Sequence, residues 1–213
     1  MKDLIILFLL SITFAAAGQT KLNTTLKRQM DSIYVLDQKY RKALTLINDP
    51  AKRDSIIKVM GVPPENYQYL QNHLDTLNLM FIERVFTKYG YPGTTLVGQP
   101  TNEAAWNVIQ HSSKIAQYLP LIKKAAENKE LPFSLYAIML DRDLMRQGKE
   151  QIYGSQIMGK KRKNGNFEMF VWPIQDPETV NERRKKAGFD LTVEENAKRL
   201  GTTYRIVKLN EVD

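Results

Sequence analysis

The sequence predicts a mainly α-helical chain, a single bundle-like domain with a small C-terminal β-hairpin. Apolar residues recur every three or four positions over most of the chain, which is the period of an amphipathic helix. Glycine, proline and asparagine interrupt that pattern at helix-length intervals. Between residues 150 and 174 the period shortens, and two apolar stretches flank a turn-forming segment, which is typical of a hairpin.

The first predicted helix carries an apolar side at helical spacing. That side is formed by Ile33, Leu36, Tyr40, Ala43 and Leu44. Asn48, Asp49 and Pro50 end the helix, because the residue before a proline avoids helical backbone angles. A shorter helix is expected over 52–60 and stops at Gly61.

A long helix is predicted over 66–89. Its apolar side would consist of Leu70, Leu74, Leu77, Phe81 and Val85. The segment YGYPGTTLVGQP, at 89–100, is rich in glycine and proline, so it predicts a loop without helix.

Three further helical stretches are expected in the middle of the chain. Thr101 is predicted to cap a helix over 101–119, and Pro120 to end or kink it before another helical piece. The next helix, over 134–147, is expected to stop at Gly148.

The hairpin is predicted to consist of strands within 150–158 and 166–174, joined by the turn KRKNGN. In a regular strand Gln151, Tyr153 and Ser155 would share one face. Gly154 would then mark a bulge or a close approach between backbones.

Two helices are expected after the hairpin. Asp176 and Pro177 have the order of a cap and a first helical residue, and this helix would end at Gly188. Thr192 and Glu195 form the pattern of a capping box for the last helix.

The first residues resemble a secretory signal. A lysine and an apolar run from Leu4 to Phe14 precede small residues that suit cleavage before Gly18 or Gln19. The run is shorter than the roughly 20 residues of a membrane span. We therefore expect a signal peptide over 1–18, a domain over 19–213 without a transmembrane span, and an exported protein, periplasmic or secreted. An uncleaved N-terminal anchor is the alternative.

Composition and missing motifs exclude several kinds of functional site. The chain has 213 residues, a formal net charge of +8 and no cysteine, so disulfides and thiolate metal sites are excluded. It also lacks a His-x-x-x-His pair, a G-x-S-x-G motif and the lysine-bearing glycine loop of nucleotide-binding proteins. We expect no metal, no cofactor and no nucleic acid partner. The ligand is unidentified, with an anion as one candidate because of the positive charge.

The stretch LYAIMLDRDLMRQGKEQIYGSQIM, at 135–158, resembles a site. Arg142 lies within an apolar helical stripe, and a buried guanidinium requires hydrogen-bond acceptors. The expected acceptors are backbone carbonyls, the amide oxygens of Gln151 and Gln156, and a distant carboxylate such as Asp37 or Asp75. Alternatively, Arg142 faces a cleft and binds an anionic group.

His111 is one of two histidines and lies at the edge of an apolar stripe. Imidazole suits proton transfer near neutral pH, but a packing role is the alternative. Gln110 precedes it. His73 is not accompanied by a comparable motif of polar residues.

Five segments together resemble the bacterial domain of unknown function family sixty-six twenty-four. They are GYPGTTLVG, AAWNVIQHS, YLPLIKKA, LDRDLMRQGKEQIYGSQ and PIQDPETVNERRKKAGF, within about residues 75–196. The resemblance implies a shared fold and no particular activity. Acids common in the family are replaced by Ser113 and Asn181, which favours other residues as the site.

Two hypotheses follow. The first is an envelope binding or interaction module with a polar pocket. The second is an enzyme, a hydrolase or transferase acting on an envelope or glycan component, that uses His111 and Arg142. The candidate catalytic residues are His111, Arg142 and Asp141, and the candidate ligand-binding residues are Gln110, Gln151, Tyr153 and Gln156.

Overall fold

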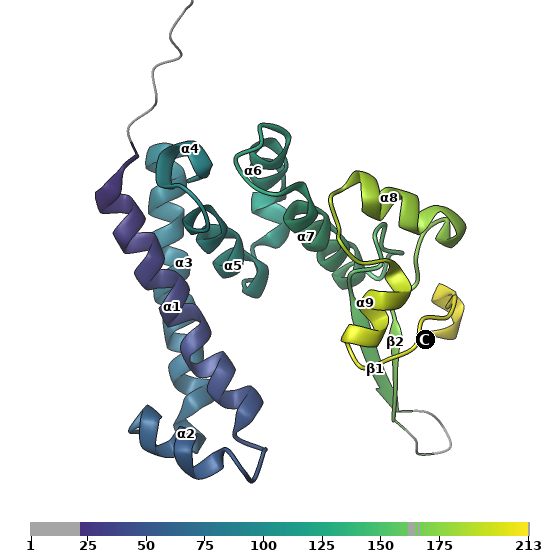
Figure 1. Cartoon of the computed structure of the whole chain (residues 1–213), viewed down its shortest axis with the longest axis horizontal. Helices are drawn as coiled ribbons and strands as arrows, with labels where there is room; N and C mark the ends of the chain where they lie inside the picture. The colour runs from purple at the N-terminus through teal and green to yellow at the C-terminus, as the bar shows by residue number, and fades with distance from the viewer. Residues whose placement is uncertain (1–21, 162–164, 166, 213) are drawn as a thin grey trace, which may run out of the picture.

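The computed structural model describes residues 22–161, 165 and 167–212. The predicted signal peptide over 1–18 therefore lies outside the described residues. The fold is mainly α-helical, with a two-stranded antiparallel sheet near the C-terminus, as predicted (Figure 1). None of the helices in the described ranges combines the length and the apolar character that a bilayer span requires.

The first three helices occupy their predicted positions. They are α1, Thr24–Leu46, α2, Arg53–Met60, and α3, Tyr67–Tyr89. α1 and α3 form a long pair, and α2 lies at the end of it that is distant from α4 (Figure 1). Gly61 ends α2 in the left-handed backbone conformation, with φ of 66°.

The apolar side predicted for α3 is confirmed except at Leu77. Val85 is buried, and Leu70, Leu74 and Phe81 are partly buried against the cores. The fully buried residues of this helix are Tyr67, Gln71, Asn78, Ile82, Val85 and Phe86. Leu77, predicted to be buried, is 47% exposed, whereas Gln71 is 1% exposed. α3 also buries polar side chains beside the predicted apolar ones, and the side-chain amide of Gln71 donates to the backbone oxygen of Asp37 on α1. A buried amide is tolerated where it is hydrogen-bonded.

The segment between α3 and the next long helix is more helical than predicted. It contains the short helix α4, Thr94–Val97, held where the Thr94 amide donates to the backbone oxygen of Glu130. Thr101 was predicted to cap a helix, and this prediction is wrong. Its hydroxyl instead donates to Asp31 of α1, over 2.6 Å, and a 3₁₀ turn precedes α5, Ala104–His111.

The predicted helix over 101–119 breaks at Ser112 rather than at Pro120. Ser112 has an extended backbone, and its hydroxyl donates to the Ile109 oxygen and accepts from the Lys114 amide. These bonds satisfy backbone groups that the break releases. Pro120 lies inside α6, Ile115–Glu127, at an exposed position.

The helix α7, Phe133–Arg146, ends as predicted before Gly148, whose φ is 68°. The first strand is shorter than predicted: β1, Ile157–Lys161, pairs with β2, Phe167–Val171. Residues 151–156 form a loop, so Gln151, Tyr153 and Ser155 share no strand face. Gly154 does mark a close approach, as expected, since a Cβ there would lie 2.7 Å from both Ile174 and Val193 side-chain atoms.

The last helices are α8, Val180–Lys186, and α9, Val193–Arg199. Asp176 adopts a left-handed backbone and makes no side-chain cap, contrary to the prediction, and a 3₁₀ turn leads into α8. The capping box of Thr192 and Glu195 is confirmed.

The position of α7 sets up the site. Met139 of α7 packs into the main core, which α1, α3, α5 and α6 share, while Met145 packs against Phe170 and Trp172 of the hairpin region. A smaller core joins β2, α8 and α9 through residues such as Val193. α7 therefore lies between the N-terminal helices and the C-terminal elements (Figure 1).

Candidate functional site: a cationic groove between α7 and α9

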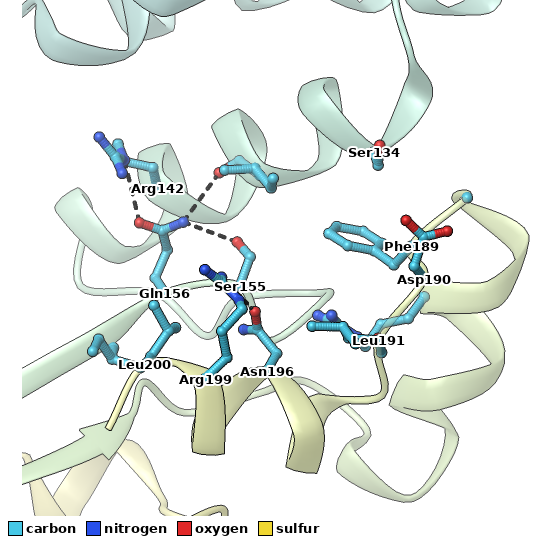
Figure 2. Close-up of a pocket in the computed structure, with 14 residues that line it drawn as sticks. Ser134, Arg142, Ser155, Gln156, Phe189, Asp190, Leu191, Asn196, Arg199 and Leu200 are labelled. Carbon is cyan, nitrogen blue, oxygen red and sulfur yellow. Dashed lines mark hydrogen bonds between the residues drawn. The ribbon is translucent and has the colours of Figure 1, made fainter. Parts of the chain in front are cut away.

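A groove of about 500 Å³ lies between α7 and the segment that leads into α9 (Figure 2). Ser134, Ile138 and Arg142 reach it from one side of α7, because residues four apart face the same direction. α9 contributes Asn196 and Arg199. The other lining residues are Ser155, Gln156, Ile157, Arg184, Gly188, Phe189, Asp190, Leu191 and Leu200.

The charge of the lining is predominantly positive. Three guanidinium groups, those of Arg142, Arg184 and Arg199, line the groove, and Asp190 is the one acid among the lining residues. Arginine binds planar anions through its forked N–H groups. The groove therefore offers an environment suited to a carboxylate or phosphate.

Arg142 is partly buried and connects two segments. Its Nε donates to Gln156 Oε1 and its Nη1 donates to the backbone oxygen of Gln110, and both distances are 3.2 Å. The predicted pairing with Gln156 is confirmed, whereas Gln151 does not bond to it. Within the described residues no carboxylate bonds to Arg142.

The two acids proposed as partners of Arg142 serve another arginine. Arg41 of α1 pairs with Asp75, and its Nη2 lies 3.5 Å from Asp37 Oδ1. Burial, with Arg146 and Arg41 nearby, lowers the pKa of Arg142. The positive charge of Arg142 therefore remains without a neighbouring counterion in the described structure.

Arg184 shapes the opposite wall. It is 2% exposed, donates from Nε to the Leu191 oxygen and from Nη1 to the Tyr153 oxygen, and lies 4.3 Å from the centre of the Phe189 ring.

Asp141 holds the loop that carries the lining residues Ser155 and Gln156. It is fully buried, and its carboxylate accepts from the backbone N–H groups of Ile152, Tyr153 and Ser155 over 2.8–3.2 Å. These bonds turn residues 151–156 into a loop instead of a strand. Burial raises the pKa of Asp141, and the three N–H donors oppose that rise. Asp141 does not line the groove.

The predicted polar residues of the loop divide into two groups. Gln156 lines the groove, and its amide nitrogen donates to the Ser155 hydroxyl, over 2.9 Å (Figure 2). Gln151 is fully buried and donates to the backbone oxygens of Gln156 and Trp172. Tyr153 lies behind the groove, with its ring beside Phe189.

The N-terminal candidates lie outside the groove. The side-chain amide of Gln110 donates to Asn107, and only its backbone oxygen meets Arg142. His111 is partly buried at the end of α5 and does not line the groove, and its imidazole makes no hydrogen bond within the described residues. His73 is exposed.

The comparison with protein families identifies a relationship over most of the chain. The profile of DUF6624, a family of unknown function, matches residues 36–208. The chain belongs to this family. The match extends beyond the range of about 75–196 over which the motifs resemble it. No curated protein and no solved structure matches the chain.

The groove of this DUF6624 chain also contains residues that its sequence did not indicate. They are Ser134, Phe189, Asp190, Asn196 and Arg199. Asn196 and Arg199 are three positions apart on α9, so a helical plot of 193–199 would have placed them on one side. Nothing local marks that side as part of a site. Within the described ranges, no three histidine or acid side chains gather as metal ligands would.

His111 gives this DUF6624 chain a predicted acid sensitivity. Burial, with Arg41 and Arg142 nearby, lowers the pKa of His111 from 6.5 to about 4. Because the folded pKa is depressed, the unfolded chain binds the proton more readily. The contribution of neutral His111 to the free energy of unfolding is fully present above pH 6.5 and is lost as pH falls toward 4. After allowance for partial exposure, we expect His111 to lower the free energy of unfolding by about 1 kcal/mol between pH 7 and pH 5.

Urea unfolding of wild type and His111→Asn at pH 7 and pH 5 measures this contribution. The variant should lose less stability than wild type between the two values. Equal losses in both proteins would show that His111 titrates as an ordinary exposed histidine. His73→Asn is the matched control, since His73 is exposed on α3, and it should behave as wild type.

Proposed function

We propose that this DUF6624 chain is a binding module whose groove between α7 and α9 takes a small anionic ligand. The observation that carries the proposal is the set of three guanidinium groups around one cavity, with Asp190 as the single acid of the lining. Arginine charges placed together repel one another, so an anion that neutralises them gains affinity.

The guanidinium groups keep free donors. Within the described residues, Nη2 of Arg142 and Nη2 of Arg184 make no hydrogen bond. Arg199 is exposed, and its one hydrogen bond there, 2.8 Å long, is to Asn196 Oδ1. Each arginine therefore has N–H groups available for a ligand, in addition to those that hold it in place.

The size and walls of the groove suit a small molecule. A volume of about 500 Å³ is within the range of ligand sites, which are commonly 300–1,000 Å³. Ile138, Ile157, Leu191 and Leu200 supply apolar walls, and Ser134 adds a hydroxyl. A ligand with an anionic group and an apolar portion matches this lining.

The same geometry favours a binding module over the enzyme hypothesis. A hydrolase or transferase using His111 and Arg142 would need both side chains at one cavity. Arg142 lines the groove and His111 does not. Asp141, the third catalytic candidate, has its carboxylate occupied by three backbone N–H groups.

Export to the cell envelope is part of the proposal and is supported by the N-terminal sequence. An apolar run followed by small residues is typical of a signal peptide. N-terminal sequencing of the protein recovered from an envelope fraction should give Gly18 or Gln19 as the first residue. Recovery of intact Met1 would contradict export by cleavage.

Arg199→Gln tests the binding function. We expect citrate and inorganic phosphate to raise the melting temperature of wild type and to bind measurably by calorimetry. Loss of one charge-assisted contact should weaken the binding about tenfold. Because Arg199 is exposed, its removal should change the free energy of unfolding by less than about 0.5 kcal/mol.

Lys198→Gln is the matched control. Lys198 neighbours Arg199 on α9 and is also exposed, but it does not line the groove. The control should retain wild-type affinity when ionic strength is held constant with chloride. Equal weakening in both variants would indicate nonspecific charge attraction and would contradict a site in the groove.

A further inference from the structure

We infer that the ligand of the groove is a short zwitterionic chain, a peptide of about three residues with a free amino group and a free carboxylate. The inference rests on the proposed function, because it assigns the carboxylate of the ligand to the arginines. It adds a second contact, between the amino group and Asp190. The resulting ligand class is narrower than anions in general.

Asp190 is the observation that points to an amino group. Its side chain lines the groove and is exposed. Within the described residues it makes no hydrogen bond and no ion pair, although three arginines line the same groove. An acid in a groove that bound only anions would repel the ligand. Its presence is consistent with a ligand that carries a positive group at that place.

Asp190 and Arg142 lie at opposite ends of the groove, while Arg184, whose guanidinium is 4.3 Å from the centre of the Phe189 ring, lies near the Asp190 end. Asp190 and Phe189 lie near Ser134, whereas Arg142 and Leu200 lie at the other end (Figure 2). Ser134 and Arg142 are the outer lining residues of α7, eight positions apart in the sequence. At 1.5 Å per helical residue they are separated by roughly 12 Å along the axis.

We take that rise along α7 as the approximate length of the ligand. An extended chain advances about 3.3–3.6 Å per residue, so about three residues span roughly 12 Å. Ile138 lies midway between Ser134 and Arg142 on the same side of α7, and it offers an apolar contact to the middle of the ligand. A free amino acid would be too short to reach both charged ends.

Three forms of one tripeptide, Ala-Leu-Ala, test the inference by calorimetry at low ionic strength. The free form is a zwitterion, the N-acetylated form is an anion and the C-amidated form is a cation. If net charge alone governed binding, the acetylated anion would bind the cationic groove most tightly. We expect the zwitterion to bind about fivefold more tightly than the acetylated form, as an exposed ion pair provides. The amidated form should bind most weakly.

Asp190→Asn should remove the preference for the zwitterion and leave the affinity for the acetylated peptide unchanged or improved. Glu182→Gln is the matched control, since Glu182 is an exposed acid on α8 that does not line the groove. The control should keep the preference. A preference that survives Asp190→Asn would overturn the inference, and so would acetylated peptide binding as tightly as the zwitterion.

The two proposals fail separately. If none of the three peptides binds while citrate or phosphate binds in an Arg199-dependent manner, the zwitterion is excluded and the anion-binding function stands. If neither the peptides nor the anions bind, the groove is not the site, and both proposals are overturned.

Discussion

Asp141→Asn should destabilise the chain by about 3 kcal/mol, because an asparagine side chain cannot accept from all the donors that face it. Three backbone N–H groups, from Ile152, Tyr153 and Ser155, point at the two carboxylate oxygens. Asparagine replaces one oxygen with an NH₂ group, which opposes a donor with a donor. The site is fully buried, so water cannot compensate.

Asp143→Asn is the control for that measurement. Asp143 lies two positions further along α7, and its carboxylate accepts from Gln147 near the surface. Its replacement should change the free energy of unfolding by less than about 0.5 kcal/mol. Urea unfolding at pH 7 compares the two variants. If Asp141→Asn were as stable as Asp143→Asn, the carboxylate would not be what holds the 151–156 loop.

Gly154→Ala should cost about 3 kcal/mol for two separate reasons. The φ of Gly154 is +66°, a conformation that costs an L-residue roughly 1–2 kcal/mol. The added Cβ would also lie 2.7 Å from Ile174 Cδ1 and from Val193 Cγ2, which are both buried. Forcing a methyl group into a packed core typically costs a further 1–3 kcal/mol.

Gly148→Ala separates those two reasons. Gly148 has a similar φ, +68°, and a Cβ there would meet nothing within 4 Å. It should therefore show only the backbone cost, about 1 kcal/mol. Thermal or urea unfolding of both variants gives the difference. Equal destabilisation would contradict the close approach of the 151–156 loop to Ile174 and to Val193 of α9.

Some contacts of the groove residues were predictable from nearby sequence, whereas others depend on distant segments. The pairing of Arg142 with Gln156 was predictable, because a guanidinium in an apolar stripe requires acceptors and Gln156 is close in the sequence. Asp37 and Asp75 were expected to pair with Arg142, and their position beside Arg41 instead was not predictable. It depends on how α1 and α3 rotate against each other, which places Arg41 beside both acids.

Features that depend on neighbouring residues were predictable from the sequence. The mainly helical class, the ends of α1 and α7 and the capping box of α9 follow from propensity, capping and the backbone freedom of glycine. These causes act within a few residues. Local reasoning therefore has all the information that it needs for them.

The break at Ser112, the burial of Gln71 on α3, the 151–156 loop and the groove depend on contacts between distant segments and could not be predicted from local sequence. The loop exists because Asp141 of α7 accepts N–H groups that would otherwise belong to a strand. The groove joins α7 to α9 across more than fifty positions of sequence. Such contacts are fixed when burial and hydrogen bonding are satisfied together by distant segments, and periodicity along one segment does not contain that information.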